Sequence, residues 1–195
     1  MMDAAVSCAA SCESILASLR VIYVMYQSAH WTSRGESFYG DHLLHQRAYE
    51  AIAEEVDSIA ERALGLGASD GILDPSRQLM MMVRASRVLM TSGSPLQVLL
   101  AAERAFLKQL DDVLGAENAQ GMLSGGLEDL LQGIASTHET HVYLLTRRIG
   151  ECVVHACVHE ASSRKKKRKK KRTFWYAGHI SSGPGGEGSS TGGCE

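Results

Sequence analysis

The strongest constraint on the fold is the spacing of apolar residues, which recur at steps of three and four in four separate stretches. This period places the apolar side chains of each stretch along one stripe of an α-helix. The stretches predict a first helix ending near Thr32, a second from about Ser37 to Gly65, a third from Ser94-Pro95 to Gly115, and a fourth beginning within 121–126. The sequence therefore predicts an all-α protein.

A long connection separates the second and third predicted helices. Within residues 65–93, Asp74-Pro75 is a favourable helix start because proline suits the first turn, and a helical pattern follows from Arg77 to Arg87. Two helices, a crossover with a short helix, and two more helices make a four-helix bundle with one long connection. That connectivity belongs to ferritin-like folds, and we place such a domain at residues 1–160.

The charged residues are segregated along the chain. Of the 22 acidic residues, 20 precede a run of nine consecutive cations, whereas only 11 of the 20 basic residues do. The run comprises Arg164, Lys165, Lys166, Lys167, Arg168, Lys169, Lys170, Lys171 and Arg172. Like charges repel, and the run has nothing apolar to bury. We therefore expect a flexible tail at residues 161–195, basic at first and rich in Gly and Ser afterwards.

Cysteine usage and hydropathy favour an intracellular protein. The five cysteines are odd in number and lack zinc-finger spacing, which argues against a disulfide framework. The N-terminal stretch lacks the positive start of a secretory signal. Glu13 and Arg20 interrupt its apolar run before it reaches the length of a membrane span. We expect a cytoplasmic protein without a membrane partner.

Four residues of the first two predicted helices form a candidate iron site: His30, His42, Asp57 and Glu61. Imidazoles and carboxylates together suit Fe(II), and Asp57 and Glu61 lie one helical turn apart. His42 precedes Asp57 by fifteen residues, or about 22 Å of helical rise, so one chain holds two half-sites. In an antiparallel two-fold dimer, the histidines of each chain would meet the carboxylates of the other.

Simpler interpretations exist for some of these residues. Asp57 and Glu61 also fit an acidic surface facing solvent, together with Glu50, Glu54 and Glu55. His138 and His141 lie in the apolar stripe of the fourth helix, which lacks the Glu-x-x-His pair of a conventional di-iron centre. We interpret these two histidines as bundle or interface residues rather than ligands.

The order of residues resembles the signature of Dps-type mini-ferritins, the DNA-binding proteins from starved cells. The resemblance extends over residues 7–150 and rests on His30-Trp31, Gly35, Phe38, His42, Tyr49-Glu50, Asp57 and the stretch 59–62. It implies a ferroxidase centre at a two-fold interface. His30 of one subunit would bind the first iron with Asp57 and Glu61 of its neighbour, and His42 would help hold the second iron. Where the family usually has another acid, this chain has Gln46, a weaker ligand, so we expect a weak second iron position.

The resemblance also implies a function. Such a protein oxidises Fe(II), with hydrogen peroxide or dioxygen as oxidant, and stores ferric mineral in a dodecamer built from two-fold dimers, which limits oxidative stress. The basic run is expected to bind DNA phosphates without sequence preference and make the protein nucleoid-associated. The alternative is a DNA-compacting or nucleus-targeted protein with weak ferroxidase activity, because nine contiguous cations also suit a nuclear-localisation signal in a eukaryotic cell.

Overall fold

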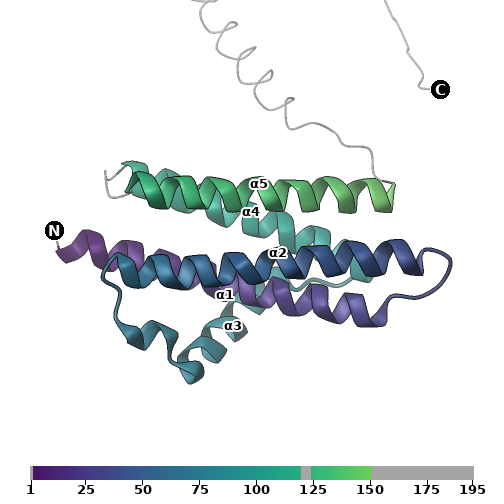
Figure 1. The fold of residues 1–195 in the computed structure, drawn as a ribbon, viewed down its shortest axis with the longest axis horizontal. Helices are drawn as coiled ribbons and strands as arrows, with labels where there is room; N and C mark the ends of the chain where they lie inside the picture. Colours follow the sequence, from purple (N-terminus) through teal and green to yellow (C-terminus); the bar gives the residue numbers. More distant parts are fainter. Residues whose placement is uncertain (1, 120–123, 151–195) are drawn as a thin grey trace, which may run out of the picture. The chain divides into compact units, whose positions relative to one another are not determined.

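The protein is represented by a computed structural model that describes residues 2–119 and 124–150, all within the first of two units, Met1–Val153. The long helices are α1 (Met2–Thr32), α2 (Phe38–Gly65), α4 (Pro95–Ala119) and α5 (Gly125–Ile149). A 3-10 turn, η1 (Asp70–Leu73), and α3 (Pro75–Leu89) occupy the connection between α2 and α4 (Figure 1). The predicted all-α bundle with a short helix in its crossover is confirmed. The predicted boundary at residue 160 and the basic run at 164–172 lie outside the described residues.

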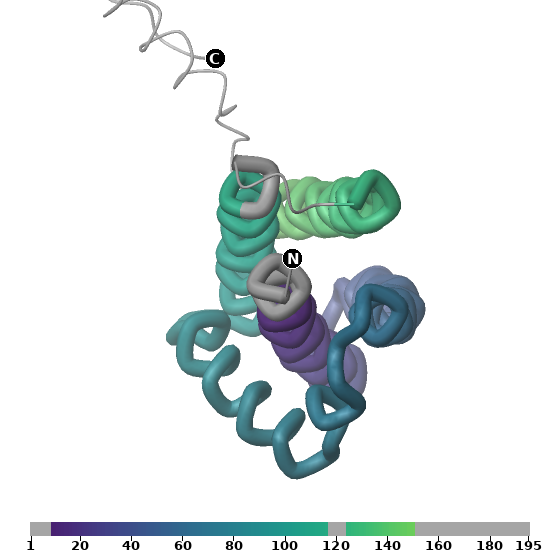
Figure 2. Tube along the Cα trace, turned by 90° about the vertical axis from the view of Figure 1, so that its left-hand side faces the viewer, coloured from purple at the N-terminus to yellow at the C-terminus, as the bar shows by residue number. Residues whose placement is uncertain are grey.

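The four long helices form two antiparallel pairs, α1 with α2 and α4 with α5 (Figure 1). Viewed along the bundle, α3 lies outside this arrangement and packs mainly on α1 (Figure 2). The predicted apolar stripes face one another and form the core. Fully buried side chains come from all four long helices and include Ile15, Leu19, Ile22, Ile52, Ile59, Phe106, Leu110, Leu127 and Leu131.

Capping residues define where the later helices begin. The Asp74 carboxylate accepts a hydrogen bond from the backbone N–H of Arg77 (3.0 Å), and Pro75 is the first residue of α3. The Ser124 hydroxyl caps α5 in the same way, through the N–H of Leu127 (3.2 Å). These contacts satisfy backbone donors that the first helical turn leaves without partners.

The third long helix runs further than the sequence predicts. We expected Gly115 to end it, but α4 continues to Ala119. Glycine inside a helix costs about 1 kcal/mol relative to alanine. Packing of the preceding residues Val113 and Leu114 against the core offsets that cost.

Helix α1 combines high hydropathy with two charges that are satisfied inside the fold. By length and composition alone, Ala9–Thr32 is able to cross a membrane, but 56% of that window is buried inside the bundle. Arg77 of α3 makes a two-pronged ion pair with Glu13, and Arg20 donates a hydrogen bond to Gln78 (3.2 Å). Packing in the bundle core therefore accounts for the apolar residues of α1.

Candidate metal centres

The two predicted histidine ligands meet where α1 joins α2. His30 lies in the last turn of α1, and His42 lies near the start of α2. Gly35 makes the reversal with a φ of 84°, a conformation that favours glycine, and its carbonyl accepts from the N–H of Phe38 (3.0 Å). The two imidazole rings stack with their centroids 3.7 Å apart and 22° between their planes.

Reciprocal hydrogen bonds fix both rings. Nδ1 of His30 donates to the backbone carbonyl of His42 (3.0 Å), and Nδ1 of His42 donates to the carbonyl of His30 (3.2 Å). A ring that carries its proton on Nδ1 has its lone pair on Nε2. Backbone carbonyls bind the second nitrogen of metal-bound histidines in this way. The pair therefore presents two oriented Nε2 donors.

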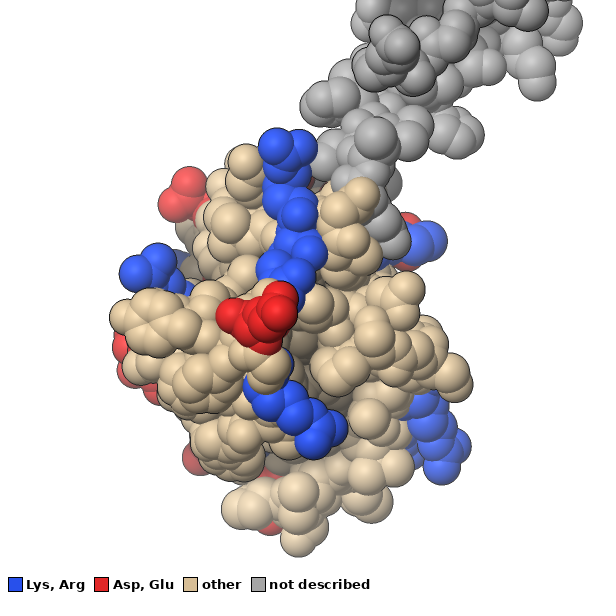
Figure 3. Space-filling model, turned by 90° about the vertical axis from the view of Figure 1, so that its right-hand side faces the viewer, with Lys and Arg blue, Asp and Glu red and all other residues tan. Residues whose placement is uncertain are grey.

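Neighbouring side chains hold this end of the bundle in place. Tyr49 packs edge-on against His30 at 5.4 Å, and Phe38 packs against His42 at 5.1 Å. Arg148, in the last turn of α5, pairs with Asp41 in the first turn of α2 through two contacts (2.6 and 2.9 Å). Figure 3 faces this end, where basic and acidic side chains touch on a largely uncharged surface.

The two predicted carboxylates lie further along α2, and both are exposed. On one continuous helix, the fifteen residues between His42 and Asp57 correspond to about 22 Å. One chain therefore does not bring them together with the histidine pair. Gln46, the weaker ligand, lies between the two groups and donates a hydrogen bond to Glu50 (2.8 Å).

A second group of histidines and carboxylates lies in the centre of the bundle, where the sequence predicted no site. Among the residues that the structure describes, Glu103 of α4 joins His138 and His141 of α5 as a possible metal-binding group. One donor atom from each side chain lies within 4.8 Å of the other two, and all three residues are buried. Both histidines lie inside the bundle, as predicted, with exposed fractions of 0% and 8%. Their grouping with Glu103 as possible ligands differs from the sequence interpretation, which did not assign them to a metal.

The Glu103 carboxylate organises this buried cluster. One oxygen accepts from the hydroxyl of Tyr26 (2.7 Å) and from Nδ1 of His141 (3.1 Å), and the other pairs with Nδ1 of His138. On the far side of its ring, Nε2 of His138 contacts Glu55 at 3.0 Å. Both ring nitrogens of His138 therefore face carboxylates, so both carry protons and the ring is an imidazolium.

The electrostatics follow from these contacts. Burial alone would raise the pKa of Glu103, but the hydrogen bonds from His138 and His141 outweigh it and lower that pKa to about 2. Burial alone would lower the pKa of His138, but Glu103 and Glu55 raise it to about 9. Burial, with Glu103 beside it, raises the pKa of Tyr26 well above its ordinary value.

One simpler interpretation from the sequence is wrong. Glu55 does not belong to an acidic surface, because its side chain is only 11% exposed and pairs with His138. The sequence did carry a signal for this cluster. Glu103 occupies a core position in the α4 stripe, and His138 and His141 occupy core positions in the α5 stripe. Polar residues at core positions need one another as partners, so they predict a contact between the two helices.

Comparison with known proteins places the fold. The ferritin-like domain family matches residues 12–152. The chain belongs to this family. A nutrient stress-induced DNA-binding protein of Synechococcus sp. is 37% identical over 59 residues, which make up 29% of this chain and 34% of that protein. The chain thus spans about a third of the length of the curated relatives it matches.

Solved Dps structures share the architecture of this ferritin-like chain. DpsC from Streptomyces coelicolor superposes with a TM-score of 0.65 at 23% identity, covering 80% of this chain and 91% of that one. A second match is a Dps protein from Vibrio cholerae O1, described as a member of a broad superfamily of ferritin-like diiron-carboxylate proteins. It superposes with a TM-score of 0.61 at 21% identity, covering 75% of this chain and 91% of that one. The ferritin-like family is therefore confirmed, and the fold is the one that these Dps structures share.

Proposed function

We propose that the protein oxidises Fe(II) at centres shared between two subunits and stores the ferric product inside an oligomer, a dodecamer built from two-fold dimers. The observation that carries this proposal is the stacked pair of His30 and His42, whose Nδ1–H groups are held by backbone carbonyls. Such a pair is built to offer Nε2 to a metal ion, yet its chain supplies no adjacent carboxylate from Asp57 or Glu61.

The register of α2 supports completion of the site by a partner subunit. A two-fold axis at the level of Ala51 and Ile52 sets His42 against the partner's Glu61. The same axis sets Gln46 against the partner's Asp57, because both pairs are centred on the same point of the helix. These residues also lie on one side of α2, within about 100° of one another. An antiparallel α2 pair thus completes two identical centres at once.

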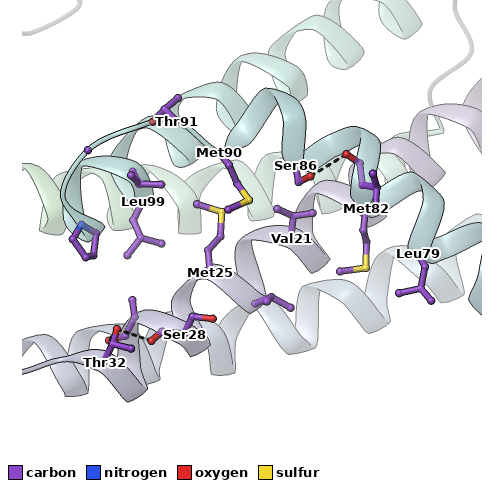
Figure 4. Close-up of a pocket in the computed structure, with 16 residues that line it drawn as sticks. Val21, Met25, Ser28, Thr32, Leu79, Met82, Ser86, Met90, Thr91 and Leu99 are labelled. Atoms are coloured by element: carbon purple, nitrogen blue, oxygen red, sulfur yellow. Dashed lines mark hydrogen bonds between the residues drawn. The ribbon is translucent and has the colours of Figure 1, made fainter.

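An apolar pocket on the side of α1 away from His30 offers a further surface for contact with another subunit. It measures about 620 Å³ and lies between α1, α3 and the start of α4. Met25 and Met90 extend toward each other across it (Figure 4). Leu79 and Val83 of α3 line its rim and are 63% and 55% exposed. Exposed apolar surface of this kind is typical of subunit interfaces.

The residues of such a centre divide the chemistry between them. Imidazole and carboxylate ligands bind Fe(II), and the negative charge of Asp57 and Glu61 favours the more highly charged Fe(III) product. With peroxide as oxidant, two Fe(II) ions supply two electrons and two protons are taken up, giving two Fe(III) and two waters. Binding iron between two subunits keeps this reaction away from bulk solvent.

Mixing of variant subunits tests the shared centre. His30→Ala and Asp57→Ala each remove one half of every site, so each variant alone should lose most iron oxidation, measured as ferric absorbance after Fe(II) and peroxide are added. When the two chains are unfolded and refolded together, half of the dimers are mixed. Each mixed dimer holds one intact centre, so activity should return to about a quarter of the wild-type rate.

The control is a mixture of His30→Ala with the double variant His30→Ala/Asp57→Ala, in which no dimer contains an intact centre. No recovery in the first mixture, with subunit exchange verified by mass spectrometry, would show that the centre is not shared. Unchanged oxidation in either single variant would show that these residues are not the ligands.

We further propose that the basic run at 164–172 binds DNA. The alternative function, a DNA-compacting protein with weak ferroxidase activity, also requires this binding. Nine contiguous cations release phosphate counterions on binding, so log K should fall with log salt with a slope of up to about −8 for each tail. Multiple tails on one oligomer add avidity. A chain ending at Ser163 should lose the gel shift of the full chain and keep its iron oxidation.

Equal DNA binding by both chains would refute the role of the tail. DNA binding that survives together with negligible iron oxidation in the full chain would favour the compacting protein. In a eukaryotic cell, loss of nuclear accumulation on the same truncation would instead identify the run as a localisation signal.

A further inference from the structure

The buried cluster of Glu103, His138 and His141 has no role in the centre proposed at the dimer interface. We propose that it is a second metal site, complete within one subunit, that binds a divalent transition-metal ion. The site uses Nδ1 of both histidines and an oxygen of Glu103. It lies inside the bundle rather than on the exposed side of α2.

The donor atoms are already assembled. Each of the three residues offers a ligand atom within 4.8 Å of the other two, and an ion at their centre needs bonds of about 2.0–2.2 Å. Two imidazoles and one carboxylate form a ligand set that zinc enzymes and non-haem iron enzymes use. Soft ligands such as thiolates are missing from this set, which favours Fe(II), Zn(II), Mn(II) or Co(II) over Cu(I).

Side chains around the three donors have the positions expected of supporting residues in a metal site. Glu55 contacts the outer nitrogen of His138 at 3.0 Å, and a carboxylate in this position orients a metal-bound imidazole and makes it a stronger donor. The Tyr26 hydroxyl donates to Glu103 at 2.7 Å and fixes that carboxylate. These contacts come from α1 and α2, so all four long helices contribute to the arrangement.

Charge balance also favours a divalent ion. Two carboxylates, those of Glu103 and Glu55, lie on either side of His138 within the bundle. A divalent ion balances the negative charges of these two carboxylates, which lowers the cost of burying them. The side chains of Glu55 and His141 remain 11% and 9% exposed, so the cluster reaches the surface at two edges.

Cobalt binding to the full chain tests this proposal. The background variant is His30→Ala/Asp57→Ala, which disables the interface centre, and Co(II) is added without oxygen. We expect one tightly bound ion per chain by equilibrium dialysis, with visible absorption bands of Co(II) in a protein site, and a rise in Tm because the ion binds only the folded bundle.

Two further substitutions in that background identify the site. His141→Gln keeps a hydrogen-bond donor near Glu103 but removes one imidazole ligand, so it should lose one bound ion per chain or weaken its binding at least tenfold. His45→Gln is the matched control, because His45 is also buried but lies outside the cluster. It should retain the ion.

Two outcomes would overturn the proposed metal site. A folded background variant that binds no ion overturns the proposal, as does a His141→Gln variant that keeps the same stoichiometry and affinity as His45→Gln. If His141→Gln does not fold, Glu55→Gln provides the second variant, and it should weaken binding about tenfold or more through the orienting contact to His138. Equal affinity in a folded Glu55→Gln variant would then overturn the proposal.

Discussion

The two groups of histidines and carboxylates differ in how much of each group one subunit completes. The buried cluster draws side chains from all four long helices, and its members satisfy one another within the chain. The group on α1 and α2 contains one finished half, the His30–His42 pair, while Asp57 and Glu61 face solvent far along α2. Burial forces polar groups to find partners, whereas exposure leaves them available to another molecule.

This difference separates two roles for the same residue types. In the interior, a carboxylate stabilises the fold because an imidazolium depends on it. On the surface, a carboxylate contributes little to folding and is free to serve as a ligand for a partner subunit. The following predictions test the contrast.

The largest expected effect is on the stability of the interior cluster. Glu103→Ala removes the partner of Tyr26, of His141 and of one side of His138, so the free energy of unfolding should fall by about 3–5 kcal/mol. Glu61→Ala removes an exposed carboxylate and should change it by less than about 0.5 kcal/mol. Urea unfolding followed by circular dichroism measures both.

Because alanine also removes packing volume, Glu103→Gln provides the control. It keeps the shape but not the charge, and its loss of stability should lie between those of the two alanine variants. Equal effects of Glu103→Ala and Glu61→Ala would remove the distinction between the two groups.

The second prediction concerns pH in the metal-free protein. The pKa of His138 is raised to about 9 in the folded state from 6.5, so its contribution is fully present below pH 6.5 and is lost as pH rises through 9. Glu103, with a pKa of about 2, stays ionised throughout this range, and the raised pKa of Tyr26 keeps its hydroxyl neutral. Unfolding free energy should therefore decrease by about 2–3 kcal/mol between pH 6 and 10.

The comparison for this pH effect is His138→Gln in the same chelator-containing buffers. It should be less stable than the wild-type chain at pH 6 and should show a flatter profile above that pH. A profile as steep as that of the wild-type chain would assign the pH dependence to other groups.

The third prediction concerns Gln46 and the second iron position of the proposed interface centre. Gln46→Glu supplies the acid that the family pattern usually has one turn after His42, and the new carboxylate would face Glu50, the present partner of Gln46. Iron bound per centre, measured by anaerobic titration with Fe(II), should rise from about one toward two, because a carboxylate is the stronger ligand for a hard cation. Gln132→Glu on α5 is a control that should leave the stoichiometry unchanged. If the number of iron ions bound per centre is also unchanged in Gln46→Glu, the second iron binds elsewhere.

The smallest expected effect is at the end of the bundle. Arg148→Ala removes the two-pronged pair with Asp41, which is partly exposed, so the unfolding free energy should fall by no more than about 1 kcal/mol. Thermal melts at low and high salt measure this loss. A larger loss would mean that the pair also positions the start of α2 and, with it, His42.

Sequence reasoning predicted the helices well because their signals are local. The apolar period, Asp74-Pro75 and the turn at Gly35 act within a few residues, so they located α1, α2 and α3 closely. The predicted end of α4 at Gly115 was wrong because the signal there is not local. Helix α4 passes through a residue of low helical propensity because distant packing holds it.

The candidate sites divide in the same way. His30 and His42 were predicted together because a short turn joins their helices. The contact of Glu55 with His138 spans 83 residues, and it depends on the rotation of two helices that no local pattern specifies. A contact between two subunits is specified even less by local patterns in one chain. The contact of Asp57 and Glu61 with the histidines of a partner subunit therefore stays a prediction.

Helix α1 has a consequence for protein synthesis. It is made before its packing partners and is apolar enough to resemble a membrane span, and the arginine that pairs with Glu13 lies 64 residues further along the chain. Until α2 and α3 have left the ribosome, this helix has none of its packing partners. The emerging chain therefore depends on rapid closure of the α1–α2 hairpin, or on a chaperone, to keep α1 from being captured by membrane-targeting factors or from aggregating.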